Sequence, residues 1–291
     1  MVKSVLGIVG GSGFYNLPGI ENPRWEKVSS PWGEPSDEIL FAEVDGLPFR
    51  FLPRHGRGHS ISPTHINFRA NIDALKRAGV TDLVSISACG SLKDQYAPGH
   101  FVLVDQFIDR TFARAKSFFG EGCVAHVSMA HPVSPLLVDA VEKAAKAEDI
   151  DHTKGGTYLA MEGPQFSTRA ESFLYRSWGC DVIGMTNMPE AKLAREAEIC
   201  YASVAMVTDY DCWHPGHAAV TVDMILSVLN ANAARARDLV RRVVPLLGRH
   251  SGACRQGCDH ALEHALITAP ESRDLVLLAR LDAVAGRVLK R

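Results

Sequence analysis

The chain has 291 residues, of which 46% are hydrophobic and 22% are charged, and its net charge is −2 with histidine counted as neutral. This composition is typical of a globular protein, and the near balance of charges argues against a nucleic-acid or membrane partner. No apolar run approaches the roughly 20 residues of a membrane span. Seven scattered cysteines and the lack of a recognisable signal peptide favour reduced thiols in the cytoplasm.

The first predicted strand covers residues 5–9 and runs into a glycine-rich turn at residues 10–13. Backbone N–H groups in such a turn, together with the hydroxyl of Ser12, can bind an anion, and a tight turn alone is the alternative. The turn departs from the dinucleotide fingerprint, because Asn16 replaces the third glycine and Pro18 interrupts the helix that should follow. The pattern therefore allows phosphate and disfavours NAD.

Two further strands, at residues 39–44 and 48–52, flank an Asp-Gly pair at residues 45–46 that is typical of a β-hairpin. The second strand runs into a loop that carries two arginines and two histidines between glycines: Arg54, His55, Arg57 and His59. Arginine offers paired donors to phosphate, and the glycines would let the loop close on it. This loop is a second candidate anion site, with a solvated basic loop as the alternative.

The middle of the chain alternates between helical and strand patterns: helix 63–77, strand 82–87, strand 101–108, helix 134–147 and strand 157–161. The strand at 82–87 ends at Ser87 and is followed by small residues from Ala88 to Ser91, where a ligand could approach the backbone. After the strand at 157–161 come the aromatic Phe166 and then Ser167, which fits the N-cap of another helix.

A βαβ pattern follows in the second half of the chain: strand 180–184, helix 189–198, strand 201–207 and then a long amphipathic helix at 220–244. Two carboxylates, Asp209 and Asp211, come directly after the strand at 201–207. Ligands of open α/β sheets bind at the carboxyl ends of strands, so both are candidate site residues. Helix capping or a turn is the alternative role for either one.

After residue 247 the alternation of strand and helix patterns ends. Residues 248–257 are polar, and Cys254 and Cys258 are separated by three residues, with three histidines nearby: His250, His260 and His264. The spacing of these residues departs from that of standard zinc fingers, so a disulfide or an inert thiol pair is favoured and no metal is predicted. A final helix is predicted at residues 272–289. We expect one α/β domain at residues 1–247 and a helical extension at residues 248–291, packed on the same domain or on a neighbouring subunit.

Five segments together resemble the methylthioadenosine-cleaving members of the trimeric branch of the purine nucleoside phosphorylase family: GIVGGSGFY, PRHGRGH, ISACGSL, MEGPQFSTRAE and GMTNMPEAKLAREAEICYASVAMVTDYDCW. The likeness covers about residues 5–247. It implies a single α/β domain with a central twisted, partly barrel-like mixed sheet flanked by helices. The implied reaction uses phosphate to cleave methylthioadenosine into adenine and 5-methylthioribose-1-phosphate.

The resemblance also implies roles for individual residues. Six are implied to bind or line the phosphate: Ser12, Arg54, His55, Ser87, Ala88 and Thr186. Phe166 is placed against the base and Met185 under the ribose. Asp209 is implied as the acid or hydrogen-bond partner at purine N7, Asp211 as the group that reads the exocyclic amine, and Tyr210 as a substrate contact between them. Phosphate is a co-substrate, and no cofactor is implied.

Two further positions bear on substrate choice. Ser167 and Asp209 stand where 6-oxopurine phosphorylases of this family have Glu and Asn, which favours adenine. Val222 stands where they place a histidine for the 5′-hydroxyl, and an apolar residue there suits a methylthio group. His126 matches a position that the family brings in from the adjacent subunit, so a homotrimer or a dimer of trimers is expected.

Three rival functions remain to be weighed. A phosphorylase for methylthioinosine, inosine or guanosine is disfavoured by Asp209 and Ser167. A hydrolytic nucleosidase is disfavoured by the set of phosphate positions, because attacking water needs no such site. A non-catalytic purine-binding or dinucleotide-binding protein is disfavoured by the presence of Asp209 and by the broken glycine fingerprint.

Overall fold

The computed structural model describes residues 4–11, 19–216, 222–247 and 253–289. Its strands form one mixed sheet of 11 members: β1 (Leu6–Gly10), β2 (Glu21–Glu26), β3 (Ile39–Val44), β4 (Leu47–Pro53), β5 (Asp82–Ser91), β6 (Phe101–Val104), β7 (Gln106–Asp109), β8 (His152–Lys154), β9 (Thr157–Ala160), β10 (Val182–Gly184) and β11 (Cys200–Asp209). The described helices are α1 (Phe68–Arg77), α2 (Pro135–Ala147), α3 (Arg169–Ser177), α4 (Asn187–Glu196), α5 (Val222–Leu247), α6 (Leu275–Arg280) and α7 (Asp282–Leu289).

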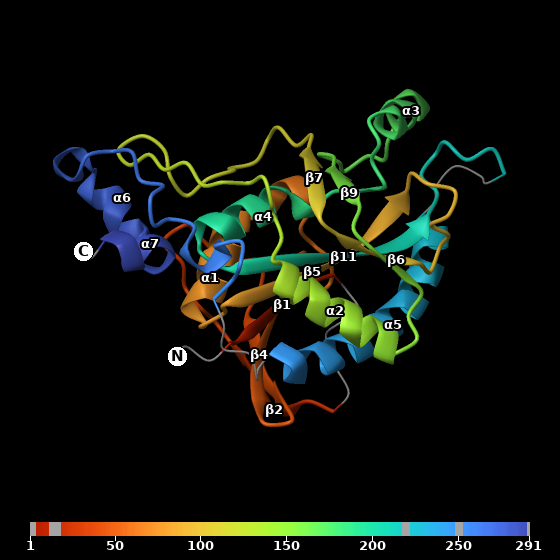
Figure 1. Cartoon of the computed structure of the whole chain (residues 1–291), viewed down its shortest axis with the longest axis horizontal. Helices are drawn as coiled ribbons and strands as arrows, with labels where there is room; N and C mark the ends of the chain where they lie inside the picture. Colours follow the sequence, from red (N-terminus) through yellow and green to blue (C-terminus); the bar gives the residue numbers. More distant parts are fainter. Residues whose placement is uncertain (1–3, 12–18, 217–221, 248–252, 290–291) are drawn as a thin grey trace.

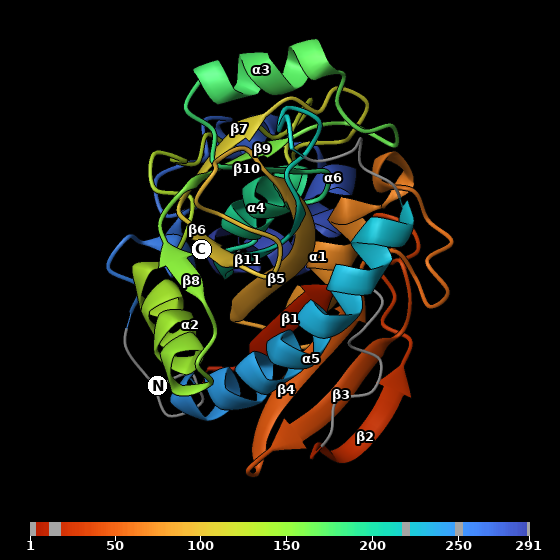
Figure 2. The same ribbon diagram turned by 90° about the vertical axis from the view of Figure 1, so that its right-hand side faces the viewer.

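The sheet branches at β5, and its two branches curve into a partly closed barrel. Strand β5 pairs with β1 and β11 in parallel along most of its length and with β10 in antiparallel fashion at its end. One branch continues from β11 to β6, and the other from β10 through β9 to β7. Because β6 and β7 are consecutive in the chain, the two branches meet and form a partly closed barrel (Figure 2). This architecture confirms the expected α/β fold with a twisted, partly barrel-like mixed sheet.

Helices cover the sheet on both sides. Helices α2 and α5 pack on each other and on β11, while α1 and α4 pack together on the opposite side, with α7 against α1 (Figure 1). Strand β11 is buried over nearly its whole length, as expected for a strand covered on both faces. The parallel strands β1, β4, β5 and β11 therefore end at a common edge inside the protein.

Several boundaries differ from those predicted. The single strand expected at residues 101–108 divides at Asp105, since β6 pairs with β11 and β7 with β9. The prediction of a single final helix at residues 272–289 is wrong, because this segment contains two separate helices, α6 and α7, on either side of Leu281. Asp209 is the last residue of β11 rather than a residue beyond it. Strands β2 and β8 were not predicted, because β2 is largely exposed and β8 has only three residues.

The N-cap of helix α3 lies one residue later than predicted. Thr168, not Ser167, caps the helix: its hydroxyl accepts from the N–H of Glu171 at 3.2 Å, and the Glu171 carboxylate accepts from the N–H of Thr168 at 2.7 Å. This is a capping box, in which two N–H groups at the helix start are satisfied reciprocally.

Replacing Thr168 with alanine is expected to lower the free energy of unfolding of α3 by about 1 kcal/mol, because the N–H of Glu171 loses its acceptor. Amide hydrogen exchange across α3 measures this change. Thr168→Ser, which retains the hydroxyl, is the matched control and should leave the exchange rates close to those of the wild type. If the amides of α3 were protected from exchange equally in Thr168→Ala and in the wild type, the stabilising role of Thr168 would be contradicted.

The tail returns to the body of the domain. Arg287 donates to Glu198 at 2.7 and 2.8 Å, and Arg77 of α1 pairs with Asp282 at the start of α7. Among the described residues, none of the helices combines the length and apolar character that crossing a membrane requires.

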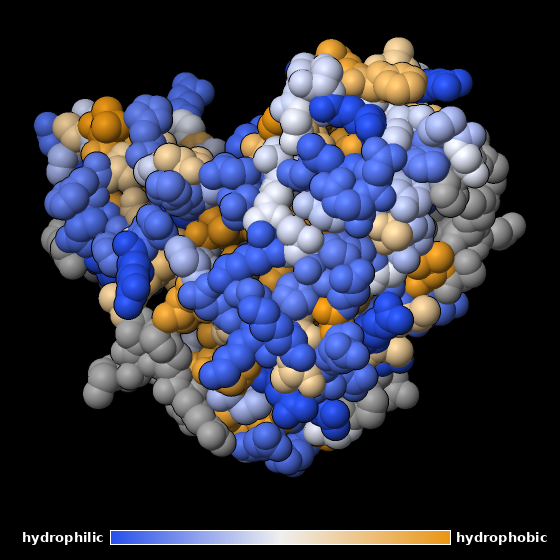
Figure 3. Space-filling model, turned by 45° about the vertical axis from the view of Figure 1, so that its right-hand side comes forward, coloured by the Kyte–Doolittle hydropathy of each residue, from blue (hydrophilic) through white to orange (hydrophobic). Residues whose placement is uncertain are grey.

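Two projecting elements, α3 and α6, carry neighbouring exposed apolar side chains (Figure 3), and Phe112 and Ile267 are exposed outside them. Helix α3 and the residue that follows it expose Phe173, Leu174 and Trp178 to between 44% and 48%. Helix α6, in the lobe that projects from the body, exposes Leu275 to 79% and Val276 to 72% (Figure 1). Apolar surface of this kind, gathered on two projecting elements, is typical of protein–protein contact.

Candidate active site

A cavity of about 430 Å³ lies at the edge where the parallel strands end. Its lining includes Gly11 after β1, Arg54 after β4, the end of β5 from Ile86 to Gly90, and the end of β11. Helix α5 contributes apolar side chains to the opposite wall. The position agrees with the rule that α/β sheets bind ligands beyond the carboxyl ends of their strands.

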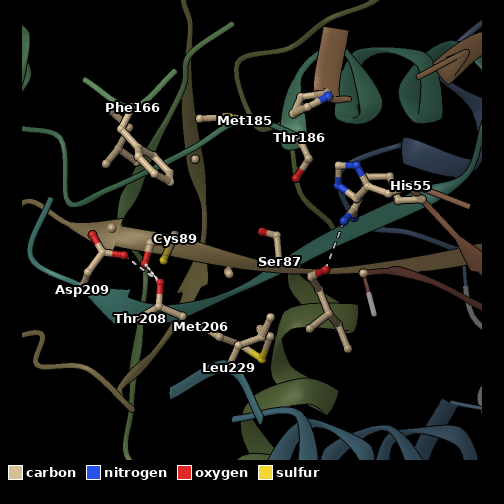
Figure 4. Close-up of a pocket in the computed structure, with 18 of the residues that line it drawn as sticks. His55, Ser87, Cys89, Phe166, Met185, Thr186, Met206, Thr208, Asp209 and Leu229 are labelled. Atoms are coloured by element: carbon tan, nitrogen blue, oxygen red, sulfur yellow. Dashed lines mark hydrogen bonds between the residues drawn. The ribbon is translucent and has the colours of Figure 1, made fainter. Parts of the chain in front are cut away.

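One end of the cavity gathers the described residues that were predicted to meet phosphate: Arg54, His55, Ser87, Ala88 and Thr186. In Figure 4, the side chains of His55, Ser87 and Thr186 lie together at this end. The hydroxyl of Thr186 is buried and has no hydrogen-bond partner, so it is available to a ligand. Ser12 lies outside the described residues, although Gly11, which precedes it, lines the cavity.

Arg54 is a buried cation held by a buried carboxylate. Its Nε donates to Glu190 Oε2 at 2.8 Å and one terminal nitrogen donates to Oε1 at 3.2 Å, while only 1% of Arg54 is exposed. Burial alone favours the neutral guanidinium, but the charge and hydrogen bonds of Glu190 raise the pKa of Arg54 above its usual value. Further hydrogen bonds to the carbonyls of Val9 and Ile86 fix the guanidinium at the end of β1 and β5.

The surroundings of His55 favour its neutral ring. Burial is the main cause that lowers the pKa of His55 to about 4; the bond to the Ile61 carbonyl opposes it, and the nearby charge of Arg54 makes a smaller lowering contribution. Nδ1 lies 2.8 Å from the Ile61 carbonyl, so a neutral ring donates from Nδ1 and leaves Nε2 as an acceptor. Hydrogen phosphate carries one proton, which Nε2 can accept as a hydrogen bond.

A buried polar network connects the residues at this end. The Ser87 hydroxyl donates to Asn187 Oδ1 at 3.2 Å, and the Asn187 amide donates to the hydroxyl of Tyr201 at 3.2 Å. Tyr201 in turn donates to Glu190 at 2.9 Å. The network therefore joins Ser87 to the partner of Arg54, and satisfied networks of this type hold side chains in one arrangement.

The other end of the cavity carries the carboxylate pair and the predicted base contacts. Asp209, Asp211, Phe166 and Met185 all line it, and Figure 4 shows Phe166 and Asp209 on the side away from His55. Asp209 accepts from the hydroxyl of Thr208 and from the N–H of Asp211, each at 2.8 Å. Burial nevertheless raises the pKa of Asp209, which favours the protonated form that a general acid needs.

Asp211 presents an unused acceptor. The residue is only 6% exposed, and its Oδ2 is buried with no hydrogen-bond partner. Burial raises the pKa of Asp211 above its ordinary value, although the nearby hydroxyls of Ser172 and Ser167 act to lower it. A buried carboxylate oxygen without a partner is unfavourable, so a ligand donor at this position would relieve that cost.

Comparison with known proteins identifies the family. Residues 5–245 match the model of the Phosphorylase superfamily. The S-methyl-5′-thioadenosine phosphorylase of Cereibacter sphaeroides is 64% identical over 99% of this chain and 100% of its own length. The chain belongs to the S-methyl-5′-thioadenosine phosphorylase family. The member from Bradyrhizobium diazoefficiens is 63% identical over 100% of both chains.

Solved structures of the S-methyl-5′-thioadenosine phosphorylase family share the fold. A methylthioadenosine phosphorylase from an antarctic soil metagenomic library is 45% identical, with a TM-score of 0.91 over 98% of this chain and 99% of that one. A mutant adenosine/methylthioadenosine phosphorylase of Schistosoma mansoni in complex with methylthioadenosine is 35% identical. Its TM-score is 0.80 over 86% of this chain and 93% of that one. These likenesses confirm the family that the sequence segments indicated.

Three described residues assigned by resemblance, Tyr210, Ser167 and His126, do not line this cavity. Tyr210 packs its ring edge-on against Trp213 at 6.0 Å. The Ser167 hydroxyl donates to Met161 Sδ at 3.7 Å and thus touches a lining residue. His126 lines a separate depression of about 410 Å³. The side chain of Val222 lies outside the described residues.

The structure also adds residues that the sequence did not single out. Glu190, Asn187 and Tyr201 lie inside one of the segments that identified the family, but only the fold shows that they meet. Leu229 and Ala233 of α5 line the cavity four residues apart, and Figure 4 shows Leu229 beside Met206. Their helical spacing was visible, but a core-facing stripe has the same spacing.

Proposed function

We propose that this chain cleaves the N-glycosidic bond of S-methyl-5′-thioadenosine with phosphate and releases adenine and 5-methylthioribose-1-phosphate. One observation carries the proposal: a single cavity holds a buried arginine and a free hydroxyl at one end and two buried carboxyls with raised pKa values at the other. Phosphate suits the first end, and a purine base suits the second. The activity of the named relatives is the same reaction.

In the proposed mechanism, the bond between ribosyl C1′ and adenine N9 breaks, and its electron pair goes to the base. C1′ becomes oxocarbenium-like, and the phosphate dianion held near Arg54 and Thr186 stabilises this charge and then attacks C1′. Asp209 gives its proton to N7 of the departing adenine, which is a poor leaving group as an anion. Phosphate is the co-substrate in this scheme, and no cofactor takes part.

The test follows free purine released from methylthioadenosine, with and without phosphate, and compares adenosine and methylthioinosine as substrates. We expect adenine release only when phosphate is present, and fastest from methylthioadenosine. Release without phosphate would identify a nucleosidase. Preference for methylthioinosine would mean that the carboxylates do not select adenine, and no release from any substrate would favour a purine-binding protein.

Asp211 is proposed to accept a hydrogen bond from the 6-amino group of adenine through its free Oδ2. Asp211→Asn replaces the carboxylate with an amide, so kcat/KM for methylthioadenosine is expected to fall about 10- to 100-fold, the value of a hydrogen bond to a charged group. The fall for methylthioinosine should be smaller, because its 6-oxo group accepts a bond that an amide can donate.

The control for Asp211→Asn is Asp139→Asn, since Asp139 is an exposed carboxylate that pairs with Lys154 on the surface. It should leave kcat/KM unchanged for both substrates. Equal losses for the two substrates in Asp211→Asn would contradict a role in reading the base.

The 5′-methylthio group is proposed to meet apolar side chains rather than a hydrogen-bonding residue. Met206 and Leu229 line the cavity between its two ends, which supports an apolar subsite (Figure 4). Val222 remains a prediction of the sequence for the same subsite. An apolar pocket discriminates weakly against a hydroxyl, so slow cleavage of adenosine is expected.

We propose a homotrimer or a dimer of trimers as the working form, located in the cytoplasm. The exposed apolar side chains of α3 and α6 support contact with further copies of the chain. The extension after residue 247, which includes α6, would take part in this contact, and His126 would approach a neighbouring site. Sedimentation equilibrium measures the number of chains in the assembly.

A further inference from the structure

Three buried cysteines meet where the C-terminal extension contacts the sheet. Cys200 begins β11, and Cys254 and Cys258 come from the segment after α5. Their sulfur atoms all lie within 4.8 Å of one another, and no member is more than 7% exposed. All seven cysteines of the chain lie in the described residues, and all are free thiols.

A tight turn places two of the three thiols side by side. The N–H of Gly257 donates to the Cys254 carbonyl at 2.9 Å, and Gly257 has a positive φ of 67°, a conformation that glycine adopts without strain. Cys258 then starts a short 3-10 helix, and Asp259 accepts from the N–H of Cys254 at 3.1 Å. Two cysteines separated by three residues fall within the spacing of two to four that zinc ligands use.

We propose that Cys200, Cys254 and Cys258 form a structural zinc site that joins the C-terminal extension to the start of β11. Three zinc–sulfur bonds form, and the three thiol protons leave to solvent. The fourth position of the tetrahedron belongs to a water molecule or to the hydroxyl of Ser134, whose Oγ lies 3.5 Å from Cys254 Sγ. The sequence indicated only the pair of cysteines in the tail, because Cys200 is remote from them in the chain.

The donor set favours zinc over other common ions. The cluster offers only sulfur, a soft ligand that selects zinc and similar thiophilic ions and not magnesium or calcium. Three thiolates on a divalent ion leave one net negative charge. Lys76 lies within electrostatic reach of Cys200 and Arg195 within reach of Cys258, and both favour this charge, whereas Asp82 near Cys200 opposes it.

The site is expected to hold the fold together and not to act in the reaction. Cys200 and Asp209 lie at opposite ends of β11, about 30 Å apart for a strand of this length. Loss of the ion should therefore loosen the extension while leaving kcat nearly unchanged in the assembled enzyme.

Metal analysis of the full-length protein, purified without chelators under reducing conditions, tests the site. We expect about one equivalent of zinc per chain, because each chain contains one cluster of three cysteines. Replacing zinc with cobalt(II) should give the thiolate-to-metal charge-transfer absorption and the intense visible bands of a tetrahedral sulfur centre. Removing the ion with a strong chelator should lower the melting temperature and expose the extension to proteases.

Single variants locate the ion. Cys254→Ser and Cys258→Ser should lose the zinc and the cobalt spectrum, whereas Cys123→Ala, which removes a buried thiol outside the cluster, should retain both. Wild-type protein that lacks zinc, and that takes up no cobalt when reduced, would overturn the proposal even if a variant failed to fold. A disulfide between two of the three cysteines in the unreduced cellular protein, or zinc retained by both serine variants, would overturn it as well.

Discussion

Replacing Asp209 with asparagine is expected to lower kcat for methylthioadenosine by about 10² to 10⁴-fold, the usual contribution of a positioned general acid. The asparagine amide can still donate a hydrogen bond to N7, but it has no proton to transfer to the leaving base. Because the loss falls on the step in which the bond breaks, KM should change much less than kcat. Initial rates of adenine release at saturating phosphate measure both constants.

The pH dependence of kcat separates proton transfer from simple binding. Burial raises the pKa of Asp209, and the protonated carboxyl is the active form. In the wild type, kcat should therefore fall as the pH rises through the pKa of Asp209 in the enzyme–substrate complex. Asp209→Asn should lack this alkaline fall. A variant that retains kcat within a few-fold of the wild type, or that keeps the same alkaline fall, would contradict the acid role.

Matched variants exclude a general disturbance of the site. Thr208→Val removes the hydroxyl that donates to Asp209 at 2.8 Å but retains the carboxyl group. Without that donor, the pKa of Asp209 should rise and the alkaline fall of kcat should shift to higher pH. The maximal kcat should fall less than it does in Asp209→Asn. Asp209→Ala, which removes the hydrogen bond as well as the proton, should be at least as impaired as Asp209→Asn.

The local patterns of the sequence predicted much of this site because strand ends and their loops are short-range features. An apolar run followed at once by polar or small residues placed Arg54, Ser87 and Asp209 at strand ends, and the structure brings these residues to one cavity, although β5 continues past Ser87 to Ser91. The resemblance to a known family gave them roles. Strand β2 was missed for the converse reason, since its exposed polar sequence carries no apolar period.

Contacts between distant segments could not be predicted from spacing. Glu190 lies in a helix that the sequence correctly predicted, but nothing in that helix indicated that its carboxylate pairs with Arg54, a residue from the first quarter of the chain. The spacing of the cysteines likewise did not indicate that Cys200, at the start of β11, lies beside Cys254 and Cys258 of the tail. The division of the final helix into α6 and α7 follows from packing, since the helical period continues across Leu281.

Replacing Glu190 with glutamine is expected to reduce the free energy of unfolding by about 3 to 5 kcal/mol, because it leaves the charge of Arg54 buried without a counter-charge. The pair is nearly free of solvent contact, with side-chain exposures of 1% and 3%. Denaturant unfolding without phosphate measures the loss. A surface control, Glu142→Gln, breaks the pairs with the exposed Lys146 and Lys154, and its effect should stay below about 1 kcal/mol.

A double-mutant cycle decides whether the buried charge is the cause of that loss. Arg54→Met alone leaves the Glu190 carboxylate unpaired and should also be strongly destabilising. The double variant, Arg54→Met with Glu190→Gln, contains neither charge, so its loss should be clearly smaller than the sum of the two single losses. In Glu190→Gln, the KM for phosphate should rise as well, because the guanidinium loses the two bonds that orient it toward the cavity. Additive losses in the cycle, or a stable Glu190→Gln protein with an unchanged KM for phosphate, would mean that the ion pair does not position Arg54.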